Sequence, residues 1–274
     1  METGECMAIE KAVGVFDSGV GGLSVLSSMR KHLPGEHFFY VADSAYMPYG
    51  CKTSEDIKQR CLLISGFLLN QGIKILVVAC NTATSVAIQT LRDELEIPVI
   101  GMEPAVKPAV YGSKSGLVGV LATSGTLNSD KFNRLKSRFS TFSELIVQPC
   151  PGLVELIENG NLQTDQTRNL LASYLQPLLD KGVDTLVLGC THYPFMLPMI
   201  RQIAGNGISI VDAGDAIARE LERQLNIHGL LNEKHQDGSV QFWTSGDKTT
   251  VQAVMTQLWN EQINLNSFDS LHKK

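Results

Sequence analysis

The 274-residue sequence has no long hydrophobic run, which limits the kinds of protein it can encode. Its longest apolar stretches, such as residues 73–79, are far shorter than the roughly 20 residues that a helix needs to cross a bilayer. The first eleven residues place glutamates before any lysine and lack the apolar segment of a signal peptide. We therefore expect a cytoplasmic protein that makes no contact with a membrane.

Basic residues are not in excess either. Lysine and arginine number 23 against 28 aspartates and glutamates, which gives a net charge of −5. Domains that bind nucleic acid usually carry a basic footprint, so we expect no direct nucleic-acid partner. Hydrophobic residues make up 43% and charged residues 19%, as in an ordinary globular protein. A chain of this length forms one large domain or two moderate ones.

None of the six cysteines forms a Cys-x-x-Cys pair, the usual spacing of a structural zinc site. Disulfide frameworks are typical of short secreted chains, so reduced and mostly buried thiols are expected here. A metal site of Cys80, Cys190 and His192 ranks below acid–base use, because no carboxylate or second histidine is spaced to complete it. No lysine stands at an obvious strand end for a Schiff base. We expect neither a metal nor a cofactor.

The sequence does contain a long internal repeat. Residues 72–82 and 182–192 align without a gap, and each runs from a glycine through apolar residues to a cysteine. Short apolar runs of this kind are typical of buried parallel strands. Residues 13–19 and 118–125 form a second pair, each a Val-Gly-Val segment that leads into a hydroxyl-bearing loop. Because strands alternate with helices, we predict two similar α/β halves with parallel sheets that face each other.

The cysteines that end the repeat are the strongest candidates for chemistry. Ligands of open α/β sheets bind beyond the carboxyl ends of the strands, where Cys80 and Cys190 are expected. Two thiols on opposite sides of a cleft would suit a racemase, since one removes an α-proton and the other supplies one. A single thiol with His192 would instead suggest acyl transfer or proteolysis. Either cysteine alone is more often a packed core residue, but the matched repeat favours a function.

The loop after the first strand carries Asp17 and Ser18 before three glycines, Gly19, Gly21 and Gly22. Glycines allow backbone N–H groups and a helix N-terminus to approach an anion. The spacing is not Gly-x-Gly-x-x-Gly, which disfavours a dinucleotide site. A simple capped turn is the alternative, here and in the equivalent loop that carries Thr123 and Thr126.

Taken together, these motifs resemble those of the bacterial glutamate racemases. The matching segments are residues 16–22, 48–50, 79–82, 189–194 and 244–247, in family order, and the match extends from residue 12 to about residue 258. The resemblance implies cofactor-independent interconversion of L- and D-glutamate, which supplies D-glutamate for peptidoglycan. It also implies two α/β domains related by pseudo-twofold symmetry, with the active site in the cleft between them.

Residue roles follow from the resemblance as expectations. Cys80 and Cys190 are implied to be the two bases, facing D-glutamate and L-glutamate respectively. Asp17 and His192 are implied to assist them, and Glu158 to support the second thiol. The residues implied to hold the substrate are Asp17, Ser18, Pro48, Tyr49, Gly50, Asn81, Thr82, Thr123, Thr126, Thr191 and His192.

Domains and partners are also expected from the family. Residues 12–103 with 212–274 are predicted to form a discontinuous first domain, residues 104–211 the second, and residues 1–11 a loose extension. A homodimer is expected, and DNA gyrase is a partner at the level of the family only. The sequence departs from the family pattern at residues 44–47, at Ala122 and in its N-terminal extension, and none of these departures touches the two implied bases.

Two alternatives stay open at this point. One is a different two-thiol racemase, such as an aspartate racemase. The other is a non-catalytic module that uses the cleft to bind a small acid or a protein, although the presence of both cysteines argues against a purely binding role.

Overall fold

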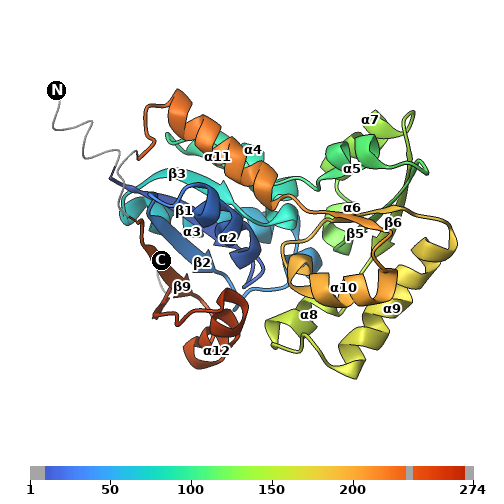
Figure 1. Cartoon of the computed structure of the whole chain (residues 1–274). Helices are drawn as coiled ribbons and strands as arrows, with labels where there is room; N and C mark the ends of the chain where they lie inside the picture. Colours follow the sequence, from blue (N-terminus) through green and yellow to red (C-terminus); the bar gives the residue numbers. More distant parts are fainter. Residues whose placement is uncertain (1–9, 233–236, 269–274) are drawn as a thin grey trace.

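Two parallel sheets form the framework of the computed structural model, which describes residues 10–232 and 237–268 (Figure 1). The predicted extension therefore lies almost wholly outside the described residues. The strand order is β10-β9-β2-β1-β3-β4 in the first sheet and β6-β5-β7-β8 in the second. The first sheet contains β1 (Ala12–Asp17), β2 (Phe38–Ala42), β3 (Ile73–Val78), β4 (Val99–Gly101), β9 (Val240–Thr244) and β10 (Leu265–Ser267). The second contains β5 (Leu117–Ala122), β6 (Glu144–Pro149), β7 (Thr185–Leu188) and β8 (Ser209–Val211).

The predicted repeat is visible in the topology. Strands β2-β1-β3-β4 of the first sheet correspond in order and direction to β6-β5-β7-β8 of the second. At the carboxyl ends of the central strands, Phe16 pairs with Val78 and Leu121 with Leu188. The hydroxyl loop and the cysteine loop of each half therefore leave the same edge of their sheet. This arrangement confirms the predicted fold class of two similar parallel-sheet α/β halves.

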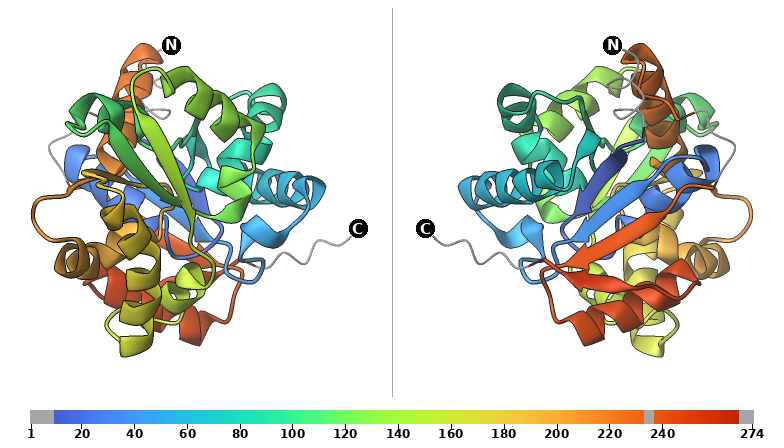
Figure 2. Two further views of the ribbon diagram at one scale, coloured as in Figure 1. Left: turned by 90° about the vertical axis from the view of Figure 1, so that its right-hand side faces the viewer. Right: turned by 90° about the vertical axis from the view of Figure 1, so that its left-hand side faces the viewer.

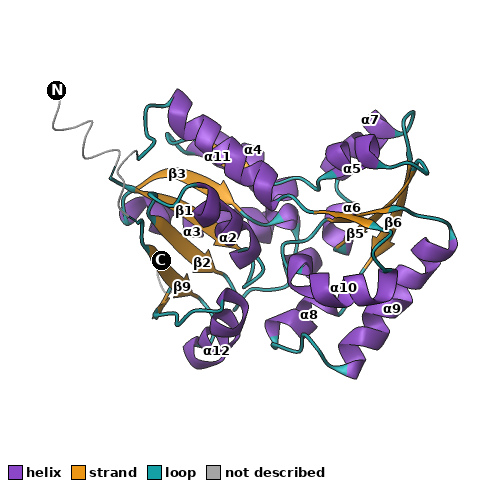
Figure 3. Ribbon diagram, in the orientation of Figure 1, coloured by secondary structure: helices purple, strands orange, loops and turns teal. Residues whose placement is uncertain are grey.

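Helices cover both faces of each sheet (Figure 3). They are α2 (Leu23–His32), α3 (Ser54–Asn70), α4 (Asn81–Glu94), α5 (Val106–Gly112), α6 (Ser124–Leu127), α7 (Asp130–Phe139), α8 (Leu153–Glu158), α9 (Asp165–Asp180), α10 (Leu197–Ala204), α11 (Gly214–Ile227) and α12 (Lys248–Trp259), with 3-10 turns η1 (Tyr49–Cys51) and η2 (Tyr193–Met196). In the first half, α2, α11 and α12 pack on one face of the sheet, and α3 and α4 on the other. The second half places α8, α9 and α10 on one face, and α5 and α7 on the other.

Helix α3 shows how local sequence sets these elements. Thr53 caps its start by accepting the N–H of Asp56 at 3.1 Å, as the sequence predicts. Gly72 follows its end with a φ of 84°, a conformation that glycine adopts at little cost. The apolar face of α3, which includes Cys61, is buried against the sheet. Cys61 is therefore a core residue, as expected.

Several short elements escaped the sequence-based prediction, among them α6, which lies where a loop carrying Thr126 was expected. Helix α5 has only seven residues, with Pro108 in its first turn, so it shows too little of a helical pattern to be recognised. Strand β10 has three residues at the sheet edge, too few to show an alternating pattern. Tyr49 and Gly50 belong to the 3-10 turn η1.

The C-terminal part of the chain returns to the first sheet. Strands β9 and β10 extend that sheet beyond β2, and the two side views show them beside it (Figure 2). This path is in keeping with the discontinuous first domain, whose boundaries stay a prediction. Within the described ranges, none of the helices has both the length and the apolar character needed to span a membrane.

Candidate active site

Hydrogen bonds join the two halves where their strand ends meet. The Thr191 hydroxyl donates to the Asp17 carboxylate at 3.1 Å, and the Val20 N–H donates to Glu158 Oε1 at 2.7 Å. Asp17 and Val20 belong to the loop after β1, whereas Thr191 and Glu158 come from the second half. The predicted hydroxyl loop of one half therefore touches the predicted cysteine loop of the other.

Cys80 lies at the N-cap of α4 and is only 5% exposed. Its sulfur accepts the N–H of Ala83 at 3.4 Å, and its thiol donates to Ser18 Oγ at 3.7 Å. Burial raises the pKa of this thiol well above its usual range, and the nearby Asp17 carboxylate adds to the effect. Cys80 is therefore a thiol in the resting state. When the thiolate forms, the N-terminus of α4 stabilises its negative charge.

Cys190 has a different set of partners. Its sulfur lies 3.6 Å from His192 Nδ1, and His192 Nε2 lies 2.6 Å from Glu158 Oε1. Burial lowers the pKa of His192, but its bonds to Cys190 and Glu158 more than compensate and raise that pKa well above its usual value. The imidazole is thus held protonated between a sulfur and a carboxylate, as a proton store for the second thiol.

The glycines after β1 allow this close approach. A Cβ atom on Gly21 would lie 2.3 Å from His192 Nδ1, and one on Gly19 would lie 1.8 Å from Glu158 Oε1. Neither separation is tolerated by real side chains. The loop therefore needs glycine at these positions for the first half to pack against the acid–base group of the second.

Asp17 is fully buried and accepts hydrogen bonds from three residues. The N–H groups of Ser18 and Gly22 donate to it at 2.7 and 2.5 Å, and the third donor is the Thr191 hydroxyl. Burial raises its pKa, an effect that the charge of His192 only partly opposes. Asp17 thus organises its loop and links the surroundings of both thiols.

Two residues that support this loop were not predicted. The Tyr40 hydroxyl donates to the Gly19 carbonyl at 2.8 Å, and Ser24 Oγ donates to the Thr191 carbonyl at 2.8 Å. Tyr40 belongs to a buried strand and Ser24 to the first turn of α2, where neither matches a motif. Ser24 closely follows the glycine-rich loop in the sequence, whereas no signal in the sequence marks Tyr40.

Polar groups for a ligand surround the thiols. Thr82, Thr123 and Thr126 form a triangle of hydroxyls, with oxygens 3.1 to 3.2 Å apart, that spans both halves. Both amide atoms of buried Asn81 lack a hydrogen-bond partner among the described residues. Because an unpaired buried amide is costly, this group is suited to bind a polar ligand. Hydroxyls and amides are appropriate donors for carboxylates and acceptors for an amine.

The remaining predicted residues lie at the edge of this arrangement. The Tyr49 hydroxyl donates to Asp43 at 2.6 Å, and Asp43 pairs with Arg60 at 2.6 Å, so the phenol is held within the first half. Gly50 lines a groove of about 480 Å³ together with Tyr49. Pro48 directly precedes η1 and is half-buried. Among the described residues, no set of three or more His, Cys, Asp or Glu side chains could hold a metal ion.

Comparison with known proteins places this geometry in a family. The family model described as Asp/Glu/Hydantoin racemase matches residues 13–221. A glutamate racemase from Ectopseudomonas mendocina is 52% identical over 93% of this chain and 97% of its own length. The fold is similar to that of glutamate racemase isoform RacE1 from Bacillus anthracis, with a TM-score of 0.86 and 32% identity over 94% of this chain and 97% of that one. It is also similar to Escherichia coli glutamate racemase in complex with L-glutamate and the activator UDP-MurNAc-ala, with a TM-score of 0.82 and 31% identity over 94% and 97% of the two chains.

Proposed function

We propose that this chain, which belongs to the Asp/Glu/hydantoin racemase family, interconverts L- and D-glutamate by moving the α-proton between two thiols. The chain is a racemase of the isomerase class, in line with its sequence identity of 52% to a glutamate racemase. The observation that carries the two-thiol mechanism is the placement of Cys80 and Cys190. They follow equivalent strands of the two sheets, and the loops beside them are joined across the two halves by the hydrogen bond from Thr191 to Asp17.

In the direction from L to D, the Cys190 thiolate takes the α-proton of L-glutamate. The Cys80 thiol then gives its own proton to the opposite face of the carbanion. Afterwards Cys190 is the thiol and Cys80 the thiolate, and the reverse reaction uses them in opposite roles. No electrons are gained or lost. Protonated His192, fixed by Glu158, stabilises the Cys190 thiolate. The N–H of Ala83 and the hydroxyl of Ser18 stabilise the Cys80 thiolate.

The α-proton of an amino acid is very weakly acidic, so the developing carbanion must be stabilised by preorganised groups. The donors assigned to the substrate are those gathered at the strand ends: Ser18, Asn81, Thr82, Thr123, Thr126 and Thr191. With the thiols only 5% and 7% exposed, these groups act in a site largely free of water, where their effect is stronger. Gly50 and the ring of Tyr49, next to Pro48, are assigned to the rim of the site.

The biological setting remains part of this proposal. D-glutamate made by the chain would serve peptidoglycan synthesis in the cytoplasm, and the protein would form a homodimer. The Escherichia coli relative is bound to L-glutamate, and a Francisella tularensis relative to D-glutamate, which supports glutamate as the substrate. DNA gyrase stays a prediction at the level of the family.

The test is racemisation of L-glutamate in D₂O without added cofactor. The unchanged protein should racemise glutamate and exchange the α-proton for deuterium, followed by optical rotation and proton NMR. Cys80→Ser and Cys190→Ser should each lose racemisation by roughly 10²–10⁴-fold, the usual contribution of a positioned acid or base. Cys51→Ser is the matched control, because Cys51 is exposed and should leave the rate unchanged.

Each other outcome points elsewhere. Full activity of Cys80→Ser or of Cys190→Ser would make that cysteine a packing residue and would contradict the two-thiol mechanism. A folded protein that racemises aspartate and not glutamate would be a different two-thiol racemase. A folded protein inert toward both amino acids would favour the non-catalytic binding module.

A further inference from the structure

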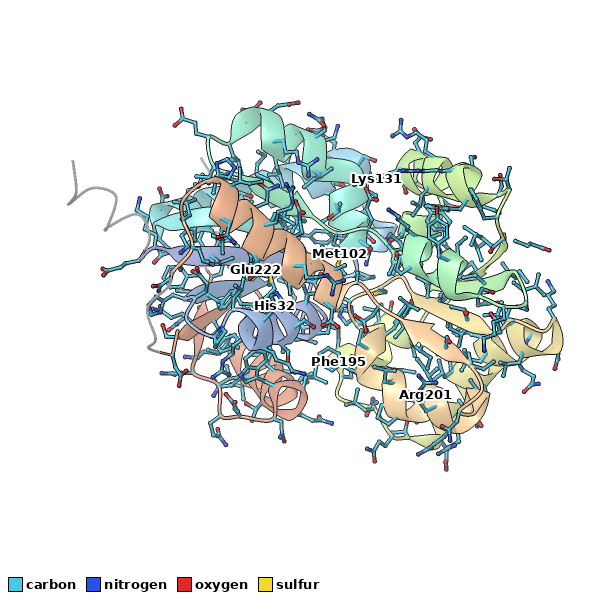
Figure 4. All side chains as sticks on the ribbon, turned by 45° about the horizontal axis from the view of Figure 1, so that its top comes forward. His32, Met102, Lys131, Phe195, Arg201 and Glu222 are labelled. Carbon is cyan, nitrogen blue, oxygen red and sulfur yellow. The ribbon has the colours of Figure 1, made fainter. Side chains whose placement is uncertain are left out.

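A groove with a strong positive charge runs along the boundary between the two halves. It has a volume of about 480 Å³ and is lined by η1 and α3 of the first half and by α6 and α7 of the second. Four cationic side chains line it against a single acid, Asp130; the cations are Lys52, Lys58, Lys131 and Arg134. Figure 4 labels Lys131 where α7 approaches α4. This density of positive charge stands out on a chain whose net charge is −5.

The positive region continues along α4 and α7. A neighbouring groove of about 450 Å³ shares Lys131 and Arg134 and adds Arg92 and Arg138. Lys131 pairs with Glu103 at 3.0 Å. In contrast, Lys52, Lys58 and Arg134 form no ion pair within the described ranges. Their charges are therefore available to a mobile anion.

The inner end of the first groove reaches the candidate active site. Gly50 and Thr82, both assigned to the substrate, line the groove together with Gly125. A Cβ atom on Gly125 would lie only 2.9 Å from Gly50 Cα. The backbones of the two halves thus touch here and form a closed seam. Because Thr82 also bonds to Thr123 and Thr126 across the same boundary, opening this seam would expose the hydroxyl triangle.

The site behind the seam has little long-range attraction for an anion. Its fixed carboxyl groups are Asp17 and Glu158, and its other donors are hydroxyls, amides and His192. Within the described ranges, no lysine or arginine side chain bonds to either thiol, to Asp17 or to Glu158. Glutamate has two carboxylates and one ammonium, so it is a net anion at neutral pH. Hydroxyls and amides hold such a molecule only at contact distance.

We propose that this groove is the approach path of the anionic substrate, and that Lys52, Lys58 and Arg134 attract glutamate to the Gly50–Gly125 seam. This inference rests on the proposed racemase function. A cleft lined by charge of one sign raises the local concentration of an oppositely charged ligand and its rate of association. The effect must weaken with salt, because the charges are exposed or half-buried and the screening length is about 10 Å at 0.1 M salt.

The test compares the unchanged protein with the triple variant Lys52→Gln, Lys58→Gln, Arg134→Gln. At low ionic strength the triple variant should show kcat/KM for L-glutamate reduced roughly tenfold, the lower bound for electrostatic steering, with kcat within about twofold. In about 0.5 M sodium chloride the two proteins should converge, because salt lowers kcat/KM of the unchanged protein only. Melting temperatures measure whether the triple variant stays folded.

Lys136→Gln is the matched control. Lys136 is exposed on α7, the helix that carries Arg134, but it lines neither groove. It should keep the kcat/KM and the salt dependence of the unchanged protein. A folded triple variant that behaves like Lys136→Gln, or a kcat/KM of the unchanged protein that does not respond to salt, would overturn the groove proposal alone. An unchanged protein that fails to racemise glutamate would instead overturn the proposed function.

Discussion

The two thiol environments occupy equivalent places in the repeated topology but differ in chemistry. Cys80 follows β3 and begins a helix of fourteen residues, with a serine hydroxyl and a backbone N–H as its partners. Cys190 follows β7 and leads into the short 3-10 turn η2, and its partner is an imidazole held by a carboxylate. A repeat can therefore preserve the position of a base while each copy stabilises its charge differently.

The difference has a physical reason in the helices that follow. A long helix supplies aligned N–H groups that favour an anion at its N-terminus. A 3-10 turn offers fewer such groups, so a charged side chain takes over this role in the second half. The loop after β1 also links the two thiol environments, since the Thr191 hydroxyl of the second half donates to Asp17 of the first.

The largest expected effect comes from replacing the side chain that contacts each thiol. His192→Gln should lower kcat by roughly 10²–10³-fold, because Cys190 loses its proton store. Ser18→Ala removes the hydroxyl that contacts Cys80 and Asp17 and should cost about 1 kcal/mol, or roughly fivefold. Both are measured by circular dichroism with L- and D-glutamate. Because catalysis cannot alter the equilibrium constant, kcat/KM must fall equally in the two directions.

Isotope exchange separates a specific role from general damage. In D₂O, His192→Gln should exchange the α-proton of D-glutamate faster than it racemises it, since Cys80 still works and the Cys190 side does not. Ser18→Ala should keep the ratio of the unchanged protein. Equal ratios in the two variants would contradict the division of labour between the halves.

The next effect tests how closely the halves must approach. Gly21→Ala places a methyl group against His192 and should lower kcat at least tenfold. Gly66→Ala is the matched control, because nothing lies within 4 Å of its Cβ position on α3. It should leave kcat unchanged and stabilise the protein by about 0.5–1 kcal/mol in urea unfolding. If Gly21→Ala is as active as Gly66→Ala, the packing of the loop on His192 has no part in catalysis.

The pH dependence of Cys80 gives a smaller but direct comparison. Burial raises the pKa of its thiol, so the reactive thiolate should appear only as the pH rises above the ordinary thiol value of about 8.5. Alkylation of the Cys80 peptide, followed by mass spectrometry, should therefore have its midpoint at a higher pH than that of N-acetylcysteine. A midpoint below that of N-acetylcysteine would mean that the helix N-terminus outweighs burial.

The raised pKa of His192 also makes the stability of the protein depend on pH. The pKa of folded His192 is raised above its unfolded value of about 6.5, so its stabilising contribution is fully present below that pH and is lost as the pH rises through the folded value. His192→Gln should therefore destabilise the protein most at acidic to neutral pH. Unfolding by urea at several pH values measures this difference.

The smallest effect concerns the unpredicted bond between α2 and the Cys190 loop. Ser24→Ala removes a donor to the Thr191 carbonyl and should cost about 0.5–1.5 kcal/mol of stability. Ser27→Ala, on the exposed side of the same helix, should cost less than this in the same unfolding assay. Equal free energies of unfolding for the two variants would show that the link adds nothing to the closed arrangement.

Much of the framework was predictable because it depends on residues that are close together in the sequence. The alternation of apolar strands and amphipathic helices gave two parallel sheets, and the gap-free repeat placed both cysteines at equivalent strand ends. Thr53 and Gly72 marked the limits of α3 through capping chemistry that involves only neighbouring residues. The short helix α5 and strand β10 escaped because seven and three residues carry too little pattern.

The site likewise has residues that the sequence predicted and residues that it did not. Motifs and family resemblance identified the thiols and the polar residues around them, but not Tyr40 or Ser24. Their partners lie 21 and 167 residues away, and no local spacing encodes such contacts. For Tyr49, the tertiary structure directs the hydroxyl to Asp43. The groove shows the same limit, because its cations come from two segments about 75 residues apart.

By itself, the sequence determined the two α/β halves, the pair of thiols and the polar loops at the strand ends. These depend on periodicity and on residues close together in the chain. Only the tertiary structure decided that Glu158 holds His192, that Gly19 and Gly21 admit this pair, and that a positive groove leads to the seam. Each of these requires residues that lie far apart in the sequence, and their relative placement is set by packing and not by local pattern.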